Sequence, residues 1–224
     1  MFRMITLSIV ILLLTASALT SNAQMAVSKE PRHKTVLENS YLRLLDVHIK
    51  PGDTTFFHHH FLPSVIVFLT DTRIGTQIKG ERPVISRTKT GNTIYAEYQK
   101  KPIFHHVWDD DSSVFHVMDI ELLRNDSVAA KHPMQAPLPG AVVNENLVIA
   151  YRITMKPNEG IKLLSFEYPL LFICTSGSGS ITINNNYPAV EMQPGKFYWI
   201  DKGNGFGYSG GKDGASYTVL QLNE

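Results

Sequence analysis

A repeat runs through this 224-residue chain at an offset of 106 residues. The offset places 50–53 (Lys-Pro-Gly-Asp) on 156–159 (Lys-Pro-Asn-Glu), and it places 63–66 (Pro-Ser-Val-Ile) on 169–172 (Pro-Leu-Leu-Phe). In both copies a turn signal precedes a short apolar run of the kind that forms a buried strand. A repeat of this length predicts two copies of one β-rich unit and not a single irregular fold.

Short strand-like segments separated by turn residues predict that both copies are all-β. No segment shows a helical period over three turns. The expected strands are 41–49, 64–69, 74–78, 84–86, 94–98, 114–122, 148–155, 170–175, 180–183, 196–200 and 216–222. The segments 109–111, 176–180 and 203–207 are expected to be turns. This pattern is typical of a β-sandwich or barrel.

The N-terminus has the layout of a secretory signal peptide. One positive charge at Arg3 precedes an apolar run over 5–14, and small residues stand at Ser21 and Ala23. We expect cleavage after Ala23, which gives a periplasmic or secreted protein. An uncleaved membrane anchor is the alternative, but the apolar run is short for a membrane span.

The rest of the chain is expected to divide into two barrels. Residues 24–130 form the first, the proline-containing segment 131–140 is a linker, and 141–224 form the second. Lys and Arg total 21 against 20 acidic residues, a balance that argues against a nucleic-acid partner. No second apolar stretch is long enough to span a membrane. The single cysteine, Cys174, cannot form an intrachain disulfide, so packing must stabilise the fold.

Histidines mark the first copy as the one that carries chemistry. Because side chains alternate along a strand, His58 and His60 share one face and His59 takes the other. A second pair, His105 and His106, precedes a strand-like run. Paired neutral imidazoles are suitable ligands for zinc, copper, iron and nickel. The alternative is that the histidines form a solvated surface turn without a metal.

These residues resemble the motifs of the cupin superfamily. The first cupin motif is a glycine, five residues, His-x-His and, three or four residues later, a glutamate; Gly52, His58 and His60 match it. Ser64 or Val65 stands where the glutamate is expected. Some cupins, such as the thiol dioxygenases, use three histidines and no carboxylate ligand.

The second cupin motif resembles the run Phe104–Asp109. Counting back from Glu121 on the following strand places the motif histidine at His105, and one inserted residue would place it at His106. The resemblance therefore implies two tandem cupin barrels, each a jelly roll or double-stranded β-helix. It implies a metal held by His58, His60 and His105 in the first barrel.

The second barrel is expected to lack that site, because the repeat offset places His58 on Leu164 and His60 on Phe166. We expect one divalent transition-metal ion, iron first, with zinc, nickel, copper or manganese as alternatives. A neutral three-histidine set leaves the ion its full charge, which favours an anionic or chelating ligand. The residues expected around the site are Ser64, His59, His106, Phe56 and Phe104.

The resulting functional hypothesis is an exported, dioxygenase-like enzyme that acts on a small chelating organic compound. No catalytic base can be assigned from the sequence. A binding module for a small ligand or metal, and a structural cupin pair, are the alternatives, because barrel folds host many functions. A homodimer is expected from the resemblance alone.

Overall fold

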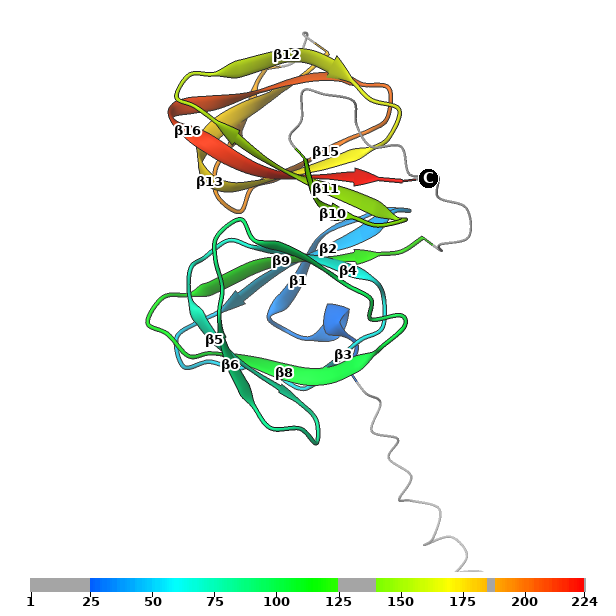
Figure 1. Cartoon of the computed structure of the whole chain (residues 1–224), viewed down its shortest axis with the longest axis vertical. Helices are drawn as coiled ribbons and strands as arrows, with labels where there is room; N and C mark the ends of the chain where they lie inside the picture. Colours follow the sequence, from blue (N-terminus) through cyan, green and yellow to red (C-terminus); the bar gives the residue numbers. More distant parts are fainter. Residues whose placement is uncertain (1–24, 125–139, 185–187, 224) are drawn as a thin grey trace, which may run out of the picture.

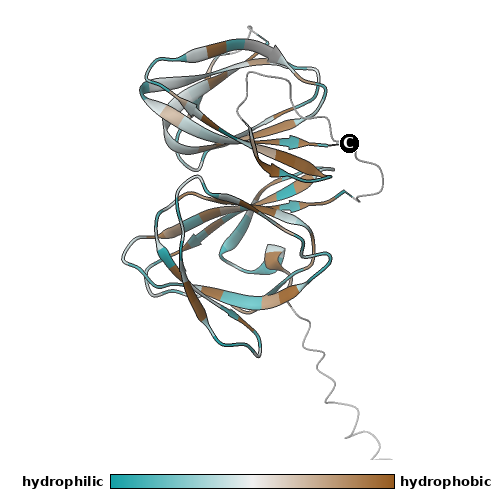
Figure 2. Cartoon of the chain, in the orientation of Figure 1, coloured by the Kyte–Doolittle hydropathy of each residue, from teal (hydrophilic) through white to brown (hydrophobic). Residues whose placement is uncertain are grey.

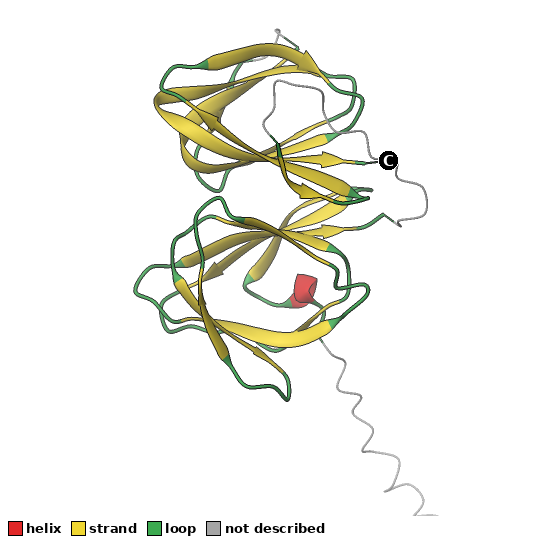
Figure 3. Ribbon diagram, viewed as in Figure 1, coloured by secondary structure: helices red, strands yellow, loops and turns green. Residues whose placement is uncertain are grey.

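The computed structural model describes residues 25–124, 140–184 and 188–223 (Figure 1). Strands make up most of this part, and its one helical element is the 3-10 turn η1 (Val27–Lys29) (Figure 3). No helix among the described residues is long and apolar enough to cross a membrane. The expected signal peptide, 1–23, lies outside the described residues, as does all but the last residue of the expected linker.

The first half of the chain is a two-layer antiparallel barrel. One sheet has the strand order β1-β2-β9-β4-β7, and the other has the order β3-β8-β5-β6. The strands are β1 (His33–Glu38), β2 (Leu42–Ile49), β3 (His58–His60), β4 (Ser64–Phe68), β5 (Arg73–Ile78), β6 (Val84–Arg87), β7 (Thr93–Ala96), β8 (Ile103–Asp109) and β9 (Phe115–Leu122).

The second half forms one strongly bent sheet of seven strands. Its order is β10-β11-β16-β13-β14, with β12 paired to β16 and β15 paired to β13. The strands are β10 (Ala141–Asn144), β11 (Val148–Met155), β12 (Gly160–Ser165), β13 (Leu170–Ile183), β14 (Val190–Met192), β15 (Phe197–Ile200) and β16 (Gly205–Leu222).

Three expected turns differ from the structure. Residues 176–180 lie inside β13, whereas the turns expected at 203–207 and 109–111 are shorter, because β16 begins at Gly205 and β8 extends to Asp109. The glycines there serve register shifts and close packing: Gly177 has a φ of 70°, and a Cβ at Gly179 would overlap Tyr217. Asp109 is buried and ends β8, because its carboxylate accepts hydrogen bonds from the backbone N–H groups of Phe115 and Asp111 at 3.0 Å.

The repeat is visible in the strands. β11 begins 106 residues after β2, and β13 begins 106 residues after β4. The strand order β10-β11-β16-β13-β15 of the second half also corresponds, position by position, to the order β1-β2-β9-β4-β7 of the first half. The all-β jelly-roll prediction is therefore confirmed, while the division into barrels at 24–130 and 141–224 stays a prediction.

Alternation along the strands divides the apolar side chains between two cores. On β2, Leu42 and Leu44 face a core that also contains Leu171 and Leu220 from the second half. Side chains on the other face of β2, such as Val47, face the interior of the first barrel. Figure 2 shows hydrophobic segments on the strands where the two halves meet.

The interior of the second half is filled by large side chains. Phe172, Phe206 and Tyr217 are almost wholly buried there, and Phe166 packs against the same cluster. Tyr217 also donates a hydrogen bond to the carbonyl of Ser209 at 2.8 Å. Aromatic packing thus occupies the space that the first half leaves open.

Candidate histidine site

A cavity of about 230 Å³ lies inside the first barrel. Its lining combines a histidine cluster with an extensive apolar wall. The lining residues are His33, Val47, Ile49, His58, His60, Ile66, Phe68, Ile74, Thr76, Ile78, Tyr98, Ile103, His105, Val107, Phe115, Val117 and Asp119.

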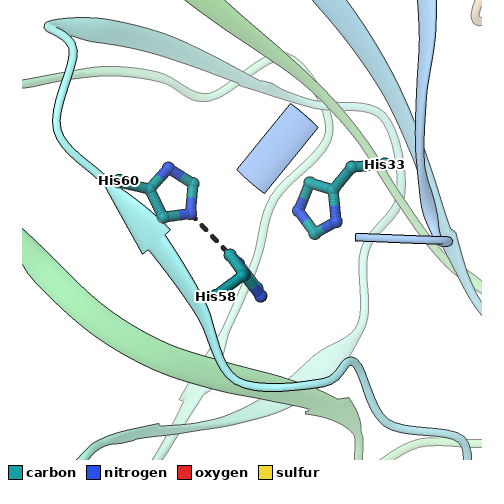
Figure 4. Close-up of side chains that lie close together, drawn as sticks. All are labelled: His33, His58 and His60. Carbon is teal, nitrogen blue, oxygen red and sulfur yellow. Dashed lines mark hydrogen bonds between the residues drawn. The ribbon is translucent and has the colours of Figure 1, made fainter. Parts of the chain in front are cut away.

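Strand β3 supplies His58 and His60, both buried and both on its inner face (Figure 4). Their Nε2 atoms are 3.1 Å apart. The Nδ1 atom of His58 lies 2.8 Å from the carbonyl oxygen of Phe56, which can only accept, so this nitrogen carries the hydrogen. The Nε2 atom of neutral His58 therefore carries a lone pair, which accepts the hydrogen bond from Nε2 of His60 that Figure 4 shows.

His33, at the start of β1, completes a cluster with this pair (Figure 4). Ligand nitrogens of His33, His58 and His60 all lie within 4.8 Å of one another. The Nδ1 atom of His33 donates to the carboxylate of Glu30 at 2.7 Å. This contact fixes the tautomer of the ring, as a carboxylate does behind many metal-ligating histidines.

Glu30 is a buried carboxylate just after η1. Its oxygens also accept the backbone N–H of Arg32 at 2.7 Å and that of Phe56 at 3.1 Å. Burial favours the neutral acid, but these hydrogen bonds and the one from His33 outweigh it and lower the pKa of Glu30 to about 2. Glu30 is therefore ionised at neutral pH and ties the N-terminal segment to the entry of β3.

His105 is the member of the second pair that faces the cavity. It lies directly across from His58 in the β3–β8 register, and its ring centroid is 4.7 Å from that of His58 and 4.9 Å from that of His60. Both of its ring nitrogens are buried and have no hydrogen-bond partner. His106 lies on the opposite face, where its ring nitrogens meet Thr54 and Gln77.

Burial favours the neutral form of His58, His60 and His105. Burial, with repulsion from neighbouring histidines, lowers the pKa of His58 to about 4 and that of His105 to about 3. The same causes hold the pKa of His60 well below its ordinary value. The neutral imidazole is the form that binds a metal ion.

A divalent metal fits this donor set. Two nitrogens bound to one ion at about 2.1 Å, with an angle of 90–109° between them, lie about 3.0–3.4 Å apart, which brackets the 3.1 Å between His58 and His60. If Nε2 of His60 bound an ion, the hydrogen of this ring would lie on Nδ1. That atom is 3.6 Å from a carboxyl oxygen of Asp119. His105 is not part of the group of mutually close nitrogens, but whichever of its two unpartnered nitrogens lacks the hydrogen supplies one further lone pair at the cavity.

Asp119 and Tyr98 complete the polar part of the cavity. Burial, together with the nearby Glu121, raises the pKa of Asp119 to about 8, although a hydrogen bond from Ser64 works against the shift. The Tyr98 ring lies 4.8 Å from the His60 ring. The sequence analysis identified neither residue, nor His33 and Glu30.

The other residues expected around the site do not line the cavity. Phe56 precedes β3 and is 58% exposed. Phe104 and His59 stack on each other at 4.4 Å on the outer side of β3 and β8, as strand alternation requires. Ser64 is buried beside Asp119, and its hydroxyl also lies within 3.2 Å of the Leu62 carbonyl.

A smaller cluster lies outside the cavity. His116 pairs with Asp46 at 2.8 Å, and the His48 ring stacks on His116 at 3.8 Å. Gly195 of the second half lies against His116 so closely that a Cβ there would come within 2.7 Å of the ring. The exposure of His48 and the existing ion pair make this cluster a weaker metal site than the buried one.

No family model and no curated protein matches the chain. Among solved structures, AerE from Microcystis aeruginosa is similar over 87% of this chain and 99% of its own (13% identity, TM-score 0.56). A salicylate 1,2-dioxygenase from Pseudaminobacter salicylatoxidans is similar over 86% of this chain and 77% of its own (11% identity, TM-score 0.58). An 11S globulin from Wrightia tinctoria is similar over 82% of this chain and 75% of its own (10% identity, TM-score 0.56). Identities this low show the fold alone, which is that of the cupin jelly rolls.

Proposed function

We propose that the first barrel holds one divalent transition-metal ion and is a dioxygenase-like enzyme for a small organic compound. The observation that carries the proposal is the convergence of four buried imidazoles, His33, His58, His60 and His105, on one cavity. A salicylate dioxygenase among the structures of similar fold supports the same class of chemistry. Iron is the first choice of ion.

The protein's own contribution is to orient the ligands and to exclude water. The Phe56 carbonyl and the Glu30 carboxylate hold hydrogens on the Nδ1 atoms of His58 and His33, so the other ring nitrogen of each remains a lone pair. Aliphatic and phenylalanine side chains surround the remaining space. A bound ion there supplies Lewis-acid activation of an organic oxygen and, if it is iron, activation of dioxygen.

The His33 imidazole takes the role that the cupin glutamate has in the motif. The chain has Ser64 or Val65 at the motif position, and the first barrel brings in His33 from a strand that precedes the motif. All four donors are then neutral, so the ion keeps its double positive charge. We place the protein in the periplasm or outside the cell on the strength of the expected signal peptide.

The test is elemental analysis of the untagged protein beside the His58→Ala/His60→Ala double variant and the matched control His48→Ala. We expect one equivalent of a transition metal in the native protein and in the control, and none in the double variant. Absence of metal from the native protein after anaerobic reconstitution with iron would contradict the proposal.

Binding without turnover is the second candidate function. It is favoured by the cavity lining, in which Thr76, Tyr98 and Asp119 are the only polar side chains besides the histidines. Oxygen consumption by the iron-loaded protein separates the two functions. Ligand binding without oxygen uptake across a substrate panel supports the binding module.

A further inference from the structure

The wall of the cavity restricts the class of compound that the histidine cluster can receive. We infer that the cavity takes a small ring compound that carries no charged group away from the histidines, and that an ionised hydroxyl beside the histidines is the one negative charge it accommodates. The inference rests on the proposed metal site and adds the class of substrate to it.

The size of the cavity sets the first limit. A volume of about 230 Å³ corresponds to about seven or eight waters at about 30 Å³ each, and apolar cavities of about 150 Å³ bind benzene. One ring with a few small substituents fills this space. A sugar chain exceeds it.

The composition of the wall sets the second limit. Ten of the seventeen described lining residues are aliphatic or phenylalanine, and none of the seventeen is lysine or arginine. The wall therefore makes burial of apolar ligand surface favourable. It offers no side-chain cation to a carboxylate, sulfonate or phosphate group on the ligand.

Two arginines of the first half are engaged in ion pairs outside the cavity. Arg32 binds Asp53 and Glu30, and Arg43 binds Glu38 and Glu121. Neither lines the cavity. A ligand carboxylate away from the histidines would thus be desolvated without a partner, which is strongly unfavourable in an apolar site.

Asp119 strengthens this discrimination in either protonation state. As a carboxylate it repels a second anion, and as a neutral acid it offers a single hydrogen bond in place of a charge. At the histidines the situation differs, because the ion's charge stabilises one ionised oxygen of the ligand. The affinity for a ligand should therefore depend on whether its negative charge lies at the histidines or elsewhere in the cavity.

A matched pair of probes tests the inference: catechol, and 3,4-dihydroxybenzoate, which adds one carboxylate to the same ring. Calorimetric titration of the zinc-loaded protein avoids oxidation of the probes. We expect catechol to bind at least tenfold more tightly than the acid. Zinc stoichiometry, measured first, reports separately on the proposed function.

Two lysine variants place a cation inside or outside the cavity. Thr76→Lys adds a cation at the cavity wall, whereas Ile85→Lys adds it at an exposed position on β6, opposite Gly75. We expect Thr76→Lys to reduce or reverse the preference for catechol and Ile85→Lys to leave it unchanged.

Equal or tighter binding of the acid to the native, zinc-loaded protein overturns the inference. So does failure of both probes to bind while zinc is held in one equivalent. These results leave the metal site intact. If Thr76→Lys does not fold, the ratio of the two affinities in the native protein still decides.

Discussion

At the scale of single residues, the histidine cluster depends on a carboxylate that no motif includes. Glu30 accepts the Nδ1 hydrogen of His33 at 2.7 Å and two backbone N–H groups. Glu30→Gln keeps the shape of the side chain but removes its charge. We expect the variant to bind Zn²⁺ about 10–100-fold more weakly, the usual cost of losing a partner behind a ligand.

Competition with a chromophoric chelator measures this affinity. The matched control is Glu38→Gln, which removes a charge from an exposed side chain of β1, the strand that carries His33. An unchanged affinity in Glu30→Gln would show that His33 does not contribute to the site.

The second prediction separates the two histidines that the sequence left open. His105 is buried with two unpartnered nitrogens, whereas His106 lies on the outer face near Thr54 and Gln77. We expect His105→Ala to lose most of the bound metal and His106→Ala to keep it. Metal content after desalting measures both variants, and the reverse result would move the site to the other face of β8.

Sequence alternation was sufficient to place part of this cluster. It predicted that His58 and His60 share a face, and the structure brings both to the cavity with His105. His33 and Asp119 could not be found in this way, because their contacts depend on how distant strands pair. A lone histidine in a polar N-terminal segment gives no local signal, and Glu30 becomes a partner only when that segment lies beside β3.

At the scale of elements, the expected strands are found, and two of the three misjudged turns lie where glycine interrupts the apolar pattern. Glycines at 177 and 179 favoured a turn in the sequence, whereas both lie within the fourteen-residue strand β13. A β-bulge and a chain reversal require the same local backbone freedom. Only the pairing with β16 distinguishes them, and that pairing is not local.

The third prediction concerns the loop between β4 and β5. The carboxylate of Asp71 accepts hydrogen bonds from the Thr90 backbone N–H at 2.7 Å and from Lys89 Nζ at 3.2 Å. These bonds lower the pKa of Asp71 to about 2. Because the pKa is lower in the folded state than in the unfolded chain, the contribution to stability is present above about pH 4 and is lost as pH falls toward 2.

Asp71→Asn should therefore lower the urea midpoint at about pH 6 and have a smaller effect at about pH 2. Urea unfolding of both proteins at the two pH values measures the difference. An equal difference at both values would mean that the hydrogen bonds of Asp71 do not distinguish its charged form.

At the scale of the whole molecule, the two halves are joined by a common core. Leu44, Val65 and Ile120 of the first half pack in one cluster with Leu171 and Leu220 of the second. The repeat predicted two similar units, but it carried no information on which faces meet. The second half, whose own interior is filled, thus supports the sheet that forms one wall of the cavity.

This shared core predicts that damage in the second half destabilises the first. Leu171 is fully buried between the halves, so Leu171→Ala should lower the free energy of unfolding by about 2–5 kcal/mol through lost burial and a residual cavity. The chain's two tryptophans report on different places: Trp108 lies on β8 of the first half, whereas Trp199 lies on β15 of the second half and packs against the shared core, 5.7 Å from the Tyr41 ring. Single-tryptophan proteins, made by Trp108→Phe or Trp199→Phe, give one fluorescence midpoint for β8 and one for the second half at the shared core.

We expect Leu171→Ala to lower both midpoints together, because unfolding of either half exposes the apolar face of the other. The matched control, Val142→Ala, changes a side chain that is 48% exposed on β10 and should leave both midpoints nearly unchanged. If only the Trp199 midpoint falls, the halves unfold independently. In that case the second half does not stabilise the barrel that holds the histidines.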